Sequence, residues 1–301
     1  MKYTIISGPT AVGKTDIVLE IASQINANII SVDSRQIYKL MDIGTAKPSK
    51  EEKSKVTHYL IDHIYPDEYY NAFLFRQDAL KIRDKLVNEG IVPLFVGGTG
   101  LYIDSLVRGF FEGVPKDEKL RKELSEMEKN EPGILRSMLE KYDPQAAQKI
   151  HPSDIKRTIR ALEVYFKTGK KISQLQTQSE YSKDYKILVL DRYRDELYER
   201  INLRVDKMIK EGLVDEVKSL LEKYPKDLNA FQTIGYKEII RYLENTYDLN
   251  TAVHLIKKNT RHYARRQIIW LRRYKQAKWI NLSEISRKKA IEEIKKFILE
   301  V

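Results

Sequence analysis

Short apolar runs alternate with helically spaced apolar residues along the first 113 positions. The runs at residues 3–7, 28–32 and 92–96 have the length and composition of strands buried on both faces. Between them, residues 16–25 and 73–88 carry apolar side chains three or four positions apart, which is typical of amphipathic helices. Strands that alternate with helices predict a parallel sheet with helices on both faces, and such sheets bind ligands at the carboxyl ends of their strands.

A different pattern begins after residue 113. Residues 117–171 show helical spacing without a convincing strand, and residues 174–185 are polar and predict a linker. The run KILVL at 186–190 predicts a further strand, and helices are expected at 194–211, 213–223, 236–246, 250–273 and 284–299. We therefore expect an α/β core made of residues 1–113 and 181–301, helical toward its C-terminal end, with an all-helical insertion domain at 114–180.

The first strand leads into GPTAVGKT at residues 8–15, which fits the pattern G-x-x-x-x-G-K-[ST] between a strand and a helix. Glycines in such a loop let backbone N–H groups surround a phosphate, the helix N-terminus attracts the anion, and Lys14 adds a positive charge. The Thr15 hydroxyl is placed to bind Mg²⁺. We therefore expect a P-loop NTPase-like core whose phosphate-binding residues are Gly8, Thr10, Ala11, Val12, Gly13, Lys14 and Thr15.

The loop does not identify the molecule that carries the phosphate. ATP, GTP and a diphosphate ester present similar oxygens, so a nucleotide-binding, ATP-binding site is one interpretation. Most P-loop nucleotide enzymes also have an Asp at the end of an apolar strand, where it supports Mg²⁺. The strand at 92–96 ends in glycine instead, and Asp191 after KILVL is expected to cap the helix that follows. A clear ATPase signature is therefore missing.

Two further strand ends carry polar residues that would face the same crevice. Asp33 begins the segment DSRQIY and could accept a proton from a nucleophile, although Asp at a strand end often forms an Asx turn instead. Thr99, in the segment GGTGLY, could supply a hydroxyl, although this segment could equally be a plain turn from a strand into a helix. Neither segment decides the function alone.

Positive charge is concentrated in the second part of the chain. The formal net charge is +11; residues 1–113 carry 13 Lys/Arg and 14 Asp/Glu, whereas residues 114–301 carry 41 and 29. Residues 257–278 contain nine Lys/Arg and no acid, interleaved with His262, Tyr263, Trp270 and Tyr274. Basic residues among aromatic ones suit RNA backbone contacts and base stacking. The alternative is a solvated basic helix face with Trp270 in the core.

Composition limits the kinds of metal site and the cellular location expected for the protein. The chain has no cysteine, which rules out disulfides and thiolate metal sites. No stretch reaches the roughly 20 apolar residues of a membrane helix, and the N-terminus shows no signal peptide. We expect a cytoplasmic protein that does not enter a membrane.

Read together, these segments resemble the tRNA dimethylallyltransferase (tRNA isopentenyltransferase) family over nearly the whole chain. Without cysteine for a C-terminal zinc finger, the chain is similar to the bacterial type. The matching segments are GPTAVGKT (8–15), ISVDSRQIYKLMDIGTAKPS (30–49), HYLIDHIYPDEYYNAFLFRQDA (58–79), FVGGTGLYIDSL (95–106), DPQAAQKIHPSDIKRTIRALEVYFKTGK (143–170), LYERINLRVDKMIKEGLVDEV (197–217), TIGYKEI (233–239) and TRHYARRQIIWLRRY (260–274).

The resemblance implies transfer of a dimethylallyl group from dimethylallyl diphosphate to the exocyclic amine of the adenosine just 3′ of the anticodon. In this reading the phosphate loop and Mg²⁺ on Thr15 stabilise a departing diphosphate, Asp33 is the general base, and Thr99 hydrogen-bonds near the reacting centre. The resemblance also implies that Arg204 contacts the diphosphate. The alternative for Arg204 is an exposed helix residue paired with Asp206 or Glu211.

The resemblance further implies a channel with the diphosphate at one end and a flipped-out base of the tRNA anticodon stem-loop at the other. A monomer is expected. The residues expected to contact tRNA are Asp33, Ser34, Arg35, Gln36, Thr99, Arg121, Lys156, Arg157, Thr158, Ile159, Arg160, Gln232, Gly235, Tyr236, Lys237, Arg265, Arg266 and Gln267.

Three other functions remain open at this stage. A P-loop small-molecule kinase would account for the first 110 residues, but not for the basic second part or the missing acid. A non-catalytic RNA-binding ATPase would not need Asp33. An isopentenyltransferase that acts on free adenosine phosphates would use the same chemistry, but would not need so much positive charge.

Overall fold

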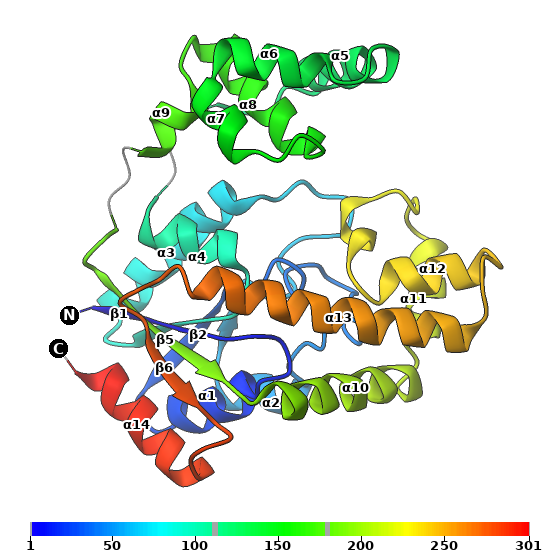
Figure 1. The fold of residues 1–301 in the computed structure, drawn as a ribbon. Coiled ribbons are helices and arrows are strands. Elements are labelled where there is room, and N and C mark those ends of the chain that lie inside the picture. The colour runs from blue at the N-terminus through cyan, green and yellow to red at the C-terminus, as the bar shows by residue number, and fades with distance from the viewer. Residues whose placement is uncertain (1, 110–113, 178–180, 301) are drawn as a thin grey trace. The chain divides into compact units, whose positions relative to one another are not determined.

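The computed structural model describes residues 2–109, 114–177 and 181–300. It divides into two compact units (Figure 1), Met1–Val107 with Lys183–Val301, and Arg108–Ser182. The domain boundaries expected at residues 113 and 180 lie outside the described residues.

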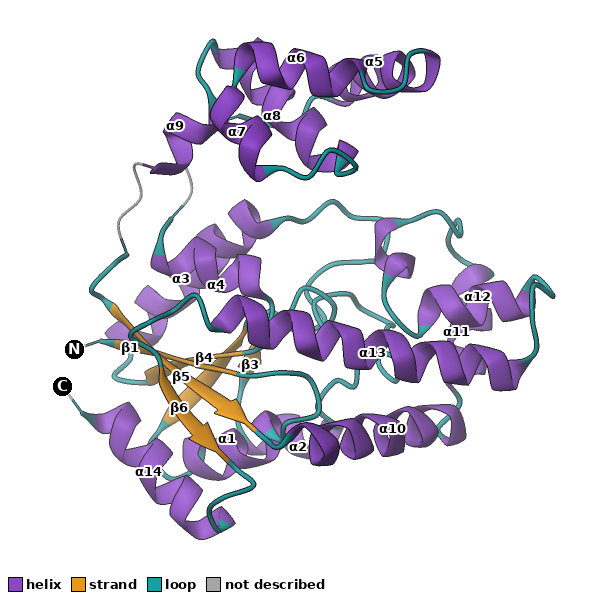
Figure 2. Cartoon of the chain, viewed as in Figure 1, coloured by secondary structure: helices purple, strands orange, loops and turns teal. Residues whose placement is uncertain are grey.

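The first unit contains a six-stranded sheet in the order β3-β2-β4-β1-β5-β6, with every pairing parallel (Figure 2). This sheet confirms the predicted α/β core. The four central strands were expected, but the two edge strands were not, because β3 has two residues and β6 buries only Ile280. The strands are β1 Tyr3–Ser7, β2 Ala27–Ser31, β3 His58–Tyr59, β4 Val92–Val96, β5 Tyr185–Asp191 and β6 Lys278–Asn281.

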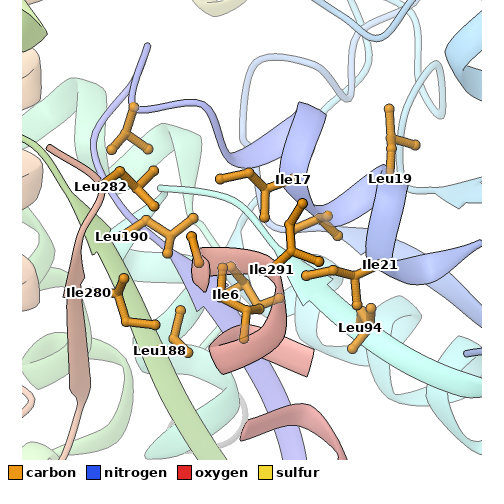
Figure 3. Packing of buried hydrophobic residues seen from close by; sticks show 14 of the residues in the cluster. Ile6, Ile17, Leu19, Ile21, Leu94, Leu188, Leu190, Ile280, Leu282 and Ile291 are labelled. Atoms are coloured by element: carbon orange, nitrogen blue, oxygen red, sulfur yellow. The ribbon is translucent and has the colours of Figure 1, made fainter. Parts of the chain in front are cut away.

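Helices cover both faces of this sheet. Helices α1 (Lys14–Ala22) and α14 (Arg287–Leu299) lie on one face, and α3 (Ala72–Asn88) and α4 (Gly100–Val107) lie on the other (Figure 1). Figure 3 shows apolar side chains of α1 and α14 packed against those of the strands. This core forms because each helix carries one apolar stripe, and each fully buried Ile or Leu contributes about 1.5–3 kcal/mol. Labelled members of this core are Ile6, Ile17, Ile21, Leu94, Leu188 and Ile291.

The short helix α2 (Lys50–Lys55) was not predicted, because it buries no residue and so has no apolar stripe. Its N-terminus is fixed by a capping box in which Ser49 accepts from the backbone N–H of Glu52 and the Glu52 carboxylate accepts from that of Ser49.

The C-terminal helices build a second core beside the sheet. They are α10 (Arg194–Lys210), α11 (Leu213–Leu221), the 3₁₀ turn Asn229–Gln232, α12 (Tyr236–Leu243) and α13 (Leu249–Leu271). The loop after β2 is fixed to them by Glu216, whose carboxylate accepts from the backbone N–H groups of Asp42, Ile43 and Gly44 at 2.9, 2.8 and 3.1 Å. One charged side chain thereby holds three loop amides in place.

The second unit is all-helical in its described part. It consists of α5 (Glu118–Asn130), α6 (Ile134–Tyr142), α7 (Pro144–Lys149), α8 (Ile155–Thr168) and α9 (Ile172–Thr177). The linker expected from residue 174 was wrong at its start, since α9 extends to 177. The buried carboxylate of Asp143 fixes α9 by accepting from the N–H and hydroxyl of Ser173 at 3.0 and 2.6 Å. Among the described residues, no helix combines the length and apolar character needed to cross a membrane.

Candidate active site

The phosphate loop lies between β1 and α1, as the motif predicts. Gly8 and Gly13 have φ of 150° and 101°, values that favour glycine. A Cβ at Gly8 would lie 2.4 Å from the carbonyl oxygen of Leu190, so no side chain fits at that position. Lys14 folds back over the loop, and its Nζ donates to the carbonyl oxygens of Gly8 and Pro9, both at 2.8 Å. The Lys14 ammonium group is therefore held against the phosphate loop, close to the N-terminus of α1.

Lys14 is poorly solvated in this position. Burial lowers its pKa to about 7, the nearby Asp33 carboxylate opposes this shift, and Arg204 reinforces it. A bound anion would favour the charged ammonium and raise the pKa again. A phosphate ligand would therefore stabilise the charged form of Lys14.

Three arginines from the end of β5 and from α10 bind the same loop. Sequence reasoning missed Arg192 and Arg200, although Arg200 lies four residues before Arg204 and therefore on the same face of α10; Arg192 precedes the helix. The bonds are Arg192 Nε to Val12 O at 2.9 Å, Arg200 Nε to Ala11 O at 2.8 Å and Arg204 Nη1 to Thr10 Oγ1 at 3.2 Å.

Arg204 lies at the cavity beside the phosphate loop, and the alternative surface ion pair is wrong. Asp206 pairs with Lys257 at 2.6 Å, and Glu211 lies 3.6 Å from Lys207. Burial lowers the pKa of Arg204 below its usual value, while the charge of Asp33 opposes the shift. A guanidinium next to the loop is suited to an anionic ligand.

The expected helix cap by Asp191 is wrong. Helix α10 begins at Arg194 with Tyr193 as its N-cap, and Asp191 Oδ1 instead accepts from the backbone N–H of Arg192 at 2.9 Å. The geometry at the end of β4 explains why no Asp follows that strand. A Cβ at Gly97 would lie 2.2 Å from the carbonyl oxygen of Val32. No Asp side chain has room at that position.

Asp33 and Thr99 lie at neighbouring strand ends and brace the same segment. Asp33 Oδ1 accepts from the backbone N–H groups of Arg35 and Gln36 at 2.8 and 3.3 Å, so the Asx turn is present. Thr99 Oγ1 accepts from the backbone N–H of Ser34 at 3.0 Å. The turn does not remove Asp33 from the site, because its side chain lines the adjoining cavities.

Two cavities meet at Asp33. The first, here called the diphosphate cavity, has a volume of about 490 Å³ and is lined by residues 10–16, 45–48, Arg200 and Arg204, among others. The acceptor cavity has about 630 Å³ and is lined by residues 34–35, 99–101, 232–234 and parts of α13. Both are lined by Thr10, Asp33, Thr45, Gly98, Arg204, Tyr263 and Gln267. A carboxylate at the junction can take a proton from a group in one cavity while an anion occupies the other.

Tyr263 is a site residue that the sequence placed only within a basic, aromatic segment. Burial raises its pKa to about 12, the charge of Asp33 acts in the same direction, and a hydrogen bond with Thr99 opposes it. Tyr263 therefore stays a neutral phenol near pH 7 and could donate a hydrogen bond at the junction. Its position there depends on the packing of α13 beside α10, which no local motif specifies (Figure 1).

The residues expected to contact tRNA in the first unit fall into two groups. Arg265 and Arg266 are exposed on α13, and Gln232, Lys237 and Arg266 line the acceptor cavity. Tyr236 is fully buried and its hydroxyl donates to Glu216 at 2.5 Å, so its side chain faces the protein core instead of solvent.

Gly235 and Gln267 are also buried. Trp270, which the alternative placed in the core, lies on the wall of the acceptor cavity against Gly100.

In the second unit, Lys156 and Arg157 are exposed, whereas Thr158 and Ile159 are buried in the helical core. Arg121 and Arg160 bind the buried carboxylate of Glu163; two Arg121 hydrogen bonds measure 2.8 Å. Burial alone would raise the pKa of Glu163, but these arginines lower it to about 2. Arg121 therefore holds α5 against α8, whereas Arg160, on α8 itself, also donates to the carbonyl oxygen of Val114 at 3.0 Å.

The chain is similar to a family model and to curated relatives. A family model described as "IPP transferase" matches residues 36–274. A tRNA dimethylallyltransferase of Thermosipho melanesiensis is 74% identical over 301 residues, covering 100% of both chains.

Two solved structures are similar over 99% of this chain. A tRNA isopentenylpyrophosphate transferase of Bacillus halodurans is 39% identical, with 95% of its chain covered and a TM-score of 0.74. A eukaryotic dimethylallyltransferase described as acting on tRNA is 28% identical, with 79% covered and a TM-score of 0.85. With its phosphate loop, the adjoining cavities and these similarities, the chain belongs to the tRNA dimethylallyltransferase family.

Proposed function

We propose that the protein transfers a dimethylallyl group from dimethylallyl diphosphate to the exocyclic amine of the adenosine 3′-adjacent to the anticodon in tRNA. The products are an isopentenyladenosine and diphosphate. The observation that carries this proposal is the meeting of a cationic, loop-lined cavity and a larger cavity at one carboxylate, Asp33.

The diphosphate cavity is suited to the leaving group. When the allylic carbon–oxygen bond breaks, negative charge develops on the diphosphate, and fixed donors stabilise that charge most effectively. The first backbone N–H groups of α1 have no partner within the helix and point toward the loop. Lys14 and Arg204 add two positive charges beside them.

Mg²⁺ would fit this cavity as a partner of the diphosphate. Thr15 lines the cavity, and its hydroxyl is an oxygen ligand of the kind Mg²⁺ binds. No three His, Cys, Asp or Glu side chains in the described part of the chain are grouped so that they could hold a metal ion. Mg²⁺ commonly takes one or two protein ligands and completes its shell with phosphate oxygens and water, where it neutralises their charge.

Asp33 would orient the adenine amine and accept its proton. The amine nitrogen bonds to the terminal allylic carbon, the carbon–oxygen bond to diphosphate breaks, and the displaced amine proton passes to the Asp33 carboxylate. Thr99 and Tyr263 lie beside Asp33 and would hydrogen-bond near the reacting centre. General base catalysis of this kind typically contributes about 10²–10⁴-fold to the rate.

The acceptor would reach Asp33 through the acceptor cavity. A base inside a structured loop must leave its stack to enter such a pocket, at a cost of a few kcal/mol. Arg265 and Arg266 are exposed on α13 and would bind the phosphates of a tRNA anticodon stem-loop around that base. We further propose that the protein acts as a monomer in the cytoplasm, where its tRNA substrate is found.

A labelling assay tests the proposal. Purified protein is incubated with Mg²⁺, labelled dimethylallyl diphosphate and tRNA that lacks the modification. Label should appear in the tRNA, at the adenosine next to the anticodon. If ATP is turned over while no label enters tRNA, the small-molecule kinase replaces this proposal; if free adenosine phosphates accept the label and tRNA does not, the adenosine-phosphate transferase replaces it.

A further inference from the structure

Gln267 connects the long helix α13 to the phosphate loop. Its Oε1 accepts from the backbone N–H of Thr10 at 2.9 Å, and its Nε2 donates to the carbonyl oxygen of Gly98 at 2.9 Å. The side chain is buried, with 7% of its surface exposed. Both ends of the amide are therefore engaged with backbone at two strand ends, those of β1 and β4.

The surrounding backbone is shaped around this side chain. A Cβ at Gly98 would lie 2.3 Å from Gln267 Nε2, so any larger residue there would displace the amide. Thr10 is held twice, at its N–H by Gln267 and at its hydroxyl by Arg204. The N-terminal part of the phosphate loop thus depends on two side chains located more than 190 residues further along the chain.

We propose that Gln267 is a positioning residue for the diphosphate leaving group, acting through Thr10 and Gly98, rather than a residue that reads RNA. This inference rests on the proposed function of the same site. Gln267 directs the Thr10 N–H away from the ligand and fixes the direction of the remaining loop donors. Because a misplacement of about 1 Å can lower a rate on the order of 100-fold, a small shift of this loop would be felt in turnover.

The test compares substitutions at neighbouring positions of α13. Gln267→Met keeps the side-chain length but removes both hydrogen bonds, whereas Arg266→Met removes an exposed charge one residue earlier. Binding of inorganic pyrophosphate with Mg²⁺ is measured by calorimetry, and binding of an unmodified anticodon stem-loop by fluorescence anisotropy. Gln267→Met should weaken pyrophosphate binding by about tenfold and leave stem-loop binding within about twofold. Arg266→Met should weaken stem-loop binding by about fourfold and leave pyrophosphate binding within about twofold.

A second variant keeps the test decisive if Gln267→Met unfolds. The carboxyl group of Gln267→Glu, when protonated, has the same acceptor and donor arrangement as the amide. Because the position is buried, the pKa of a carboxyl group there is raised above its ordinary value of about 4.3. The pyrophosphate affinity of this variant relative to wild type should therefore recover as the pH falls from about 7 to about 4, where the carboxyl group acquires its proton. A ratio that does not change with pH would overturn the inference, as would a Gln267→Met protein that loses stem-loop binding and keeps pyrophosphate binding.

Neither binding measurement requires prenyl transfer, so the outcome is separate from that of the labelling assay. If label fails to enter tRNA but pyrophosphate binding still depends on Gln267, the proposed function fails and the positioning role stands. If prenyl transfer occurs and pyrophosphate binding does not depend on Gln267, the proposed function stands and only the positioning role is wrong.

Discussion

The diphosphate and acceptor cavities meet at Asp33 but are built by different means. The diphosphate cavity is built around one continuous segment, residues 10–16, whose turn depends on glycine and whose backbone N–H groups face the cavity, with Arg200 and Arg204 added from α10. The acceptor cavity is lined by side chains from segments near residues 34, 99, 233 and 263. The phosphate donors are thus encoded in one local segment that distant side chains brace, whereas the acceptor cavity exists only through the packing of distant helices.

Substitution of Asp33 should have the largest effect, since Asp33 belongs to both cavities. Asp33→Asn retains an oxygen that can accept from Arg35 and Gln36, so the turn is preserved while the base is lost. Turnover should fall by about 10³-fold, within the usual range for a general base. Pyrophosphate and stem-loop binding should each change less than about threefold. Equal loss of binding and turnover would mean that Asp33 acts only in structure or binding.

Substitution of Lys14 should affect the diphosphate cavity alone. Lys14→Met removes a charged donor to the ligand, and hydrogen bonds to charged groups contribute about 1.5–3 kcal/mol. Pyrophosphate affinity measured by calorimetry should fall by up to about 100-fold at pH 6, where the ammonium is charged. Stem-loop affinity should stay unchanged, and a parallel loss of it would show that the two cavities are not separable.

Charge reversal on α13 should affect the acceptor side alone. The double variant Arg265→Glu, Arg266→Glu should weaken stem-loop binding by roughly tenfold at moderate salt and reduce the slope of log affinity against log salt. Pyrophosphate binding serves as the internal control and should be unaffected. An unchanged salt slope would remove these two arginines from the RNA interface.

The smallest expected effect is a pH dependence of pyrophosphate binding. Free Lys14 loses its proton near pH 7 because burial lowers its pKa, and the anion binds the protonated form better. Bound anion raises that pKa, so affinity is greatest below about pH 7 and falls by roughly fivefold from pH 7 to 8. Lys14→Arg keeps its charge throughout this range and should flatten the pH profile. An equally steep profile in this variant would mean that another group causes the pH dependence.

The difference between the two cavities also explains which site residues the sequence could predict. The phosphate loop, Asp33 and Thr99 lie directly after strands, so the strand pattern alone predicts that they share one edge of the sheet. Gln267 and Tyr263 join them only because α13 packs across the same edge, and no local pattern specifies that packing.

Helix packing also decides which of the residues expected to contact tRNA have exposed side chains. Tyr236 and Thr158 stand in segments that resemble the family, yet both side chains are buried. A segment match identifies a region expected to contact RNA, but only the helical phase within the folded protein decides which of its side chains reach the surface.

In the proposed reaction the phosphate loop holds a leaving group, so the bond that breaks joins carbon to oxygen. Dimethylallyl diphosphate labelled with ¹⁸O at the bridging oxygen tests this directly, with mass spectrometry of both products after reaction with unmodified tRNA. We predict that all of the ¹⁸O leaves with the diphosphate while the unlabelled prenyl group is found on the tRNA adenosine. Retention of ¹⁸O on a prenyl alcohol, with phosphate transferred elsewhere, would mean that phosphorus–oxygen cleavage occurs and would contradict the account.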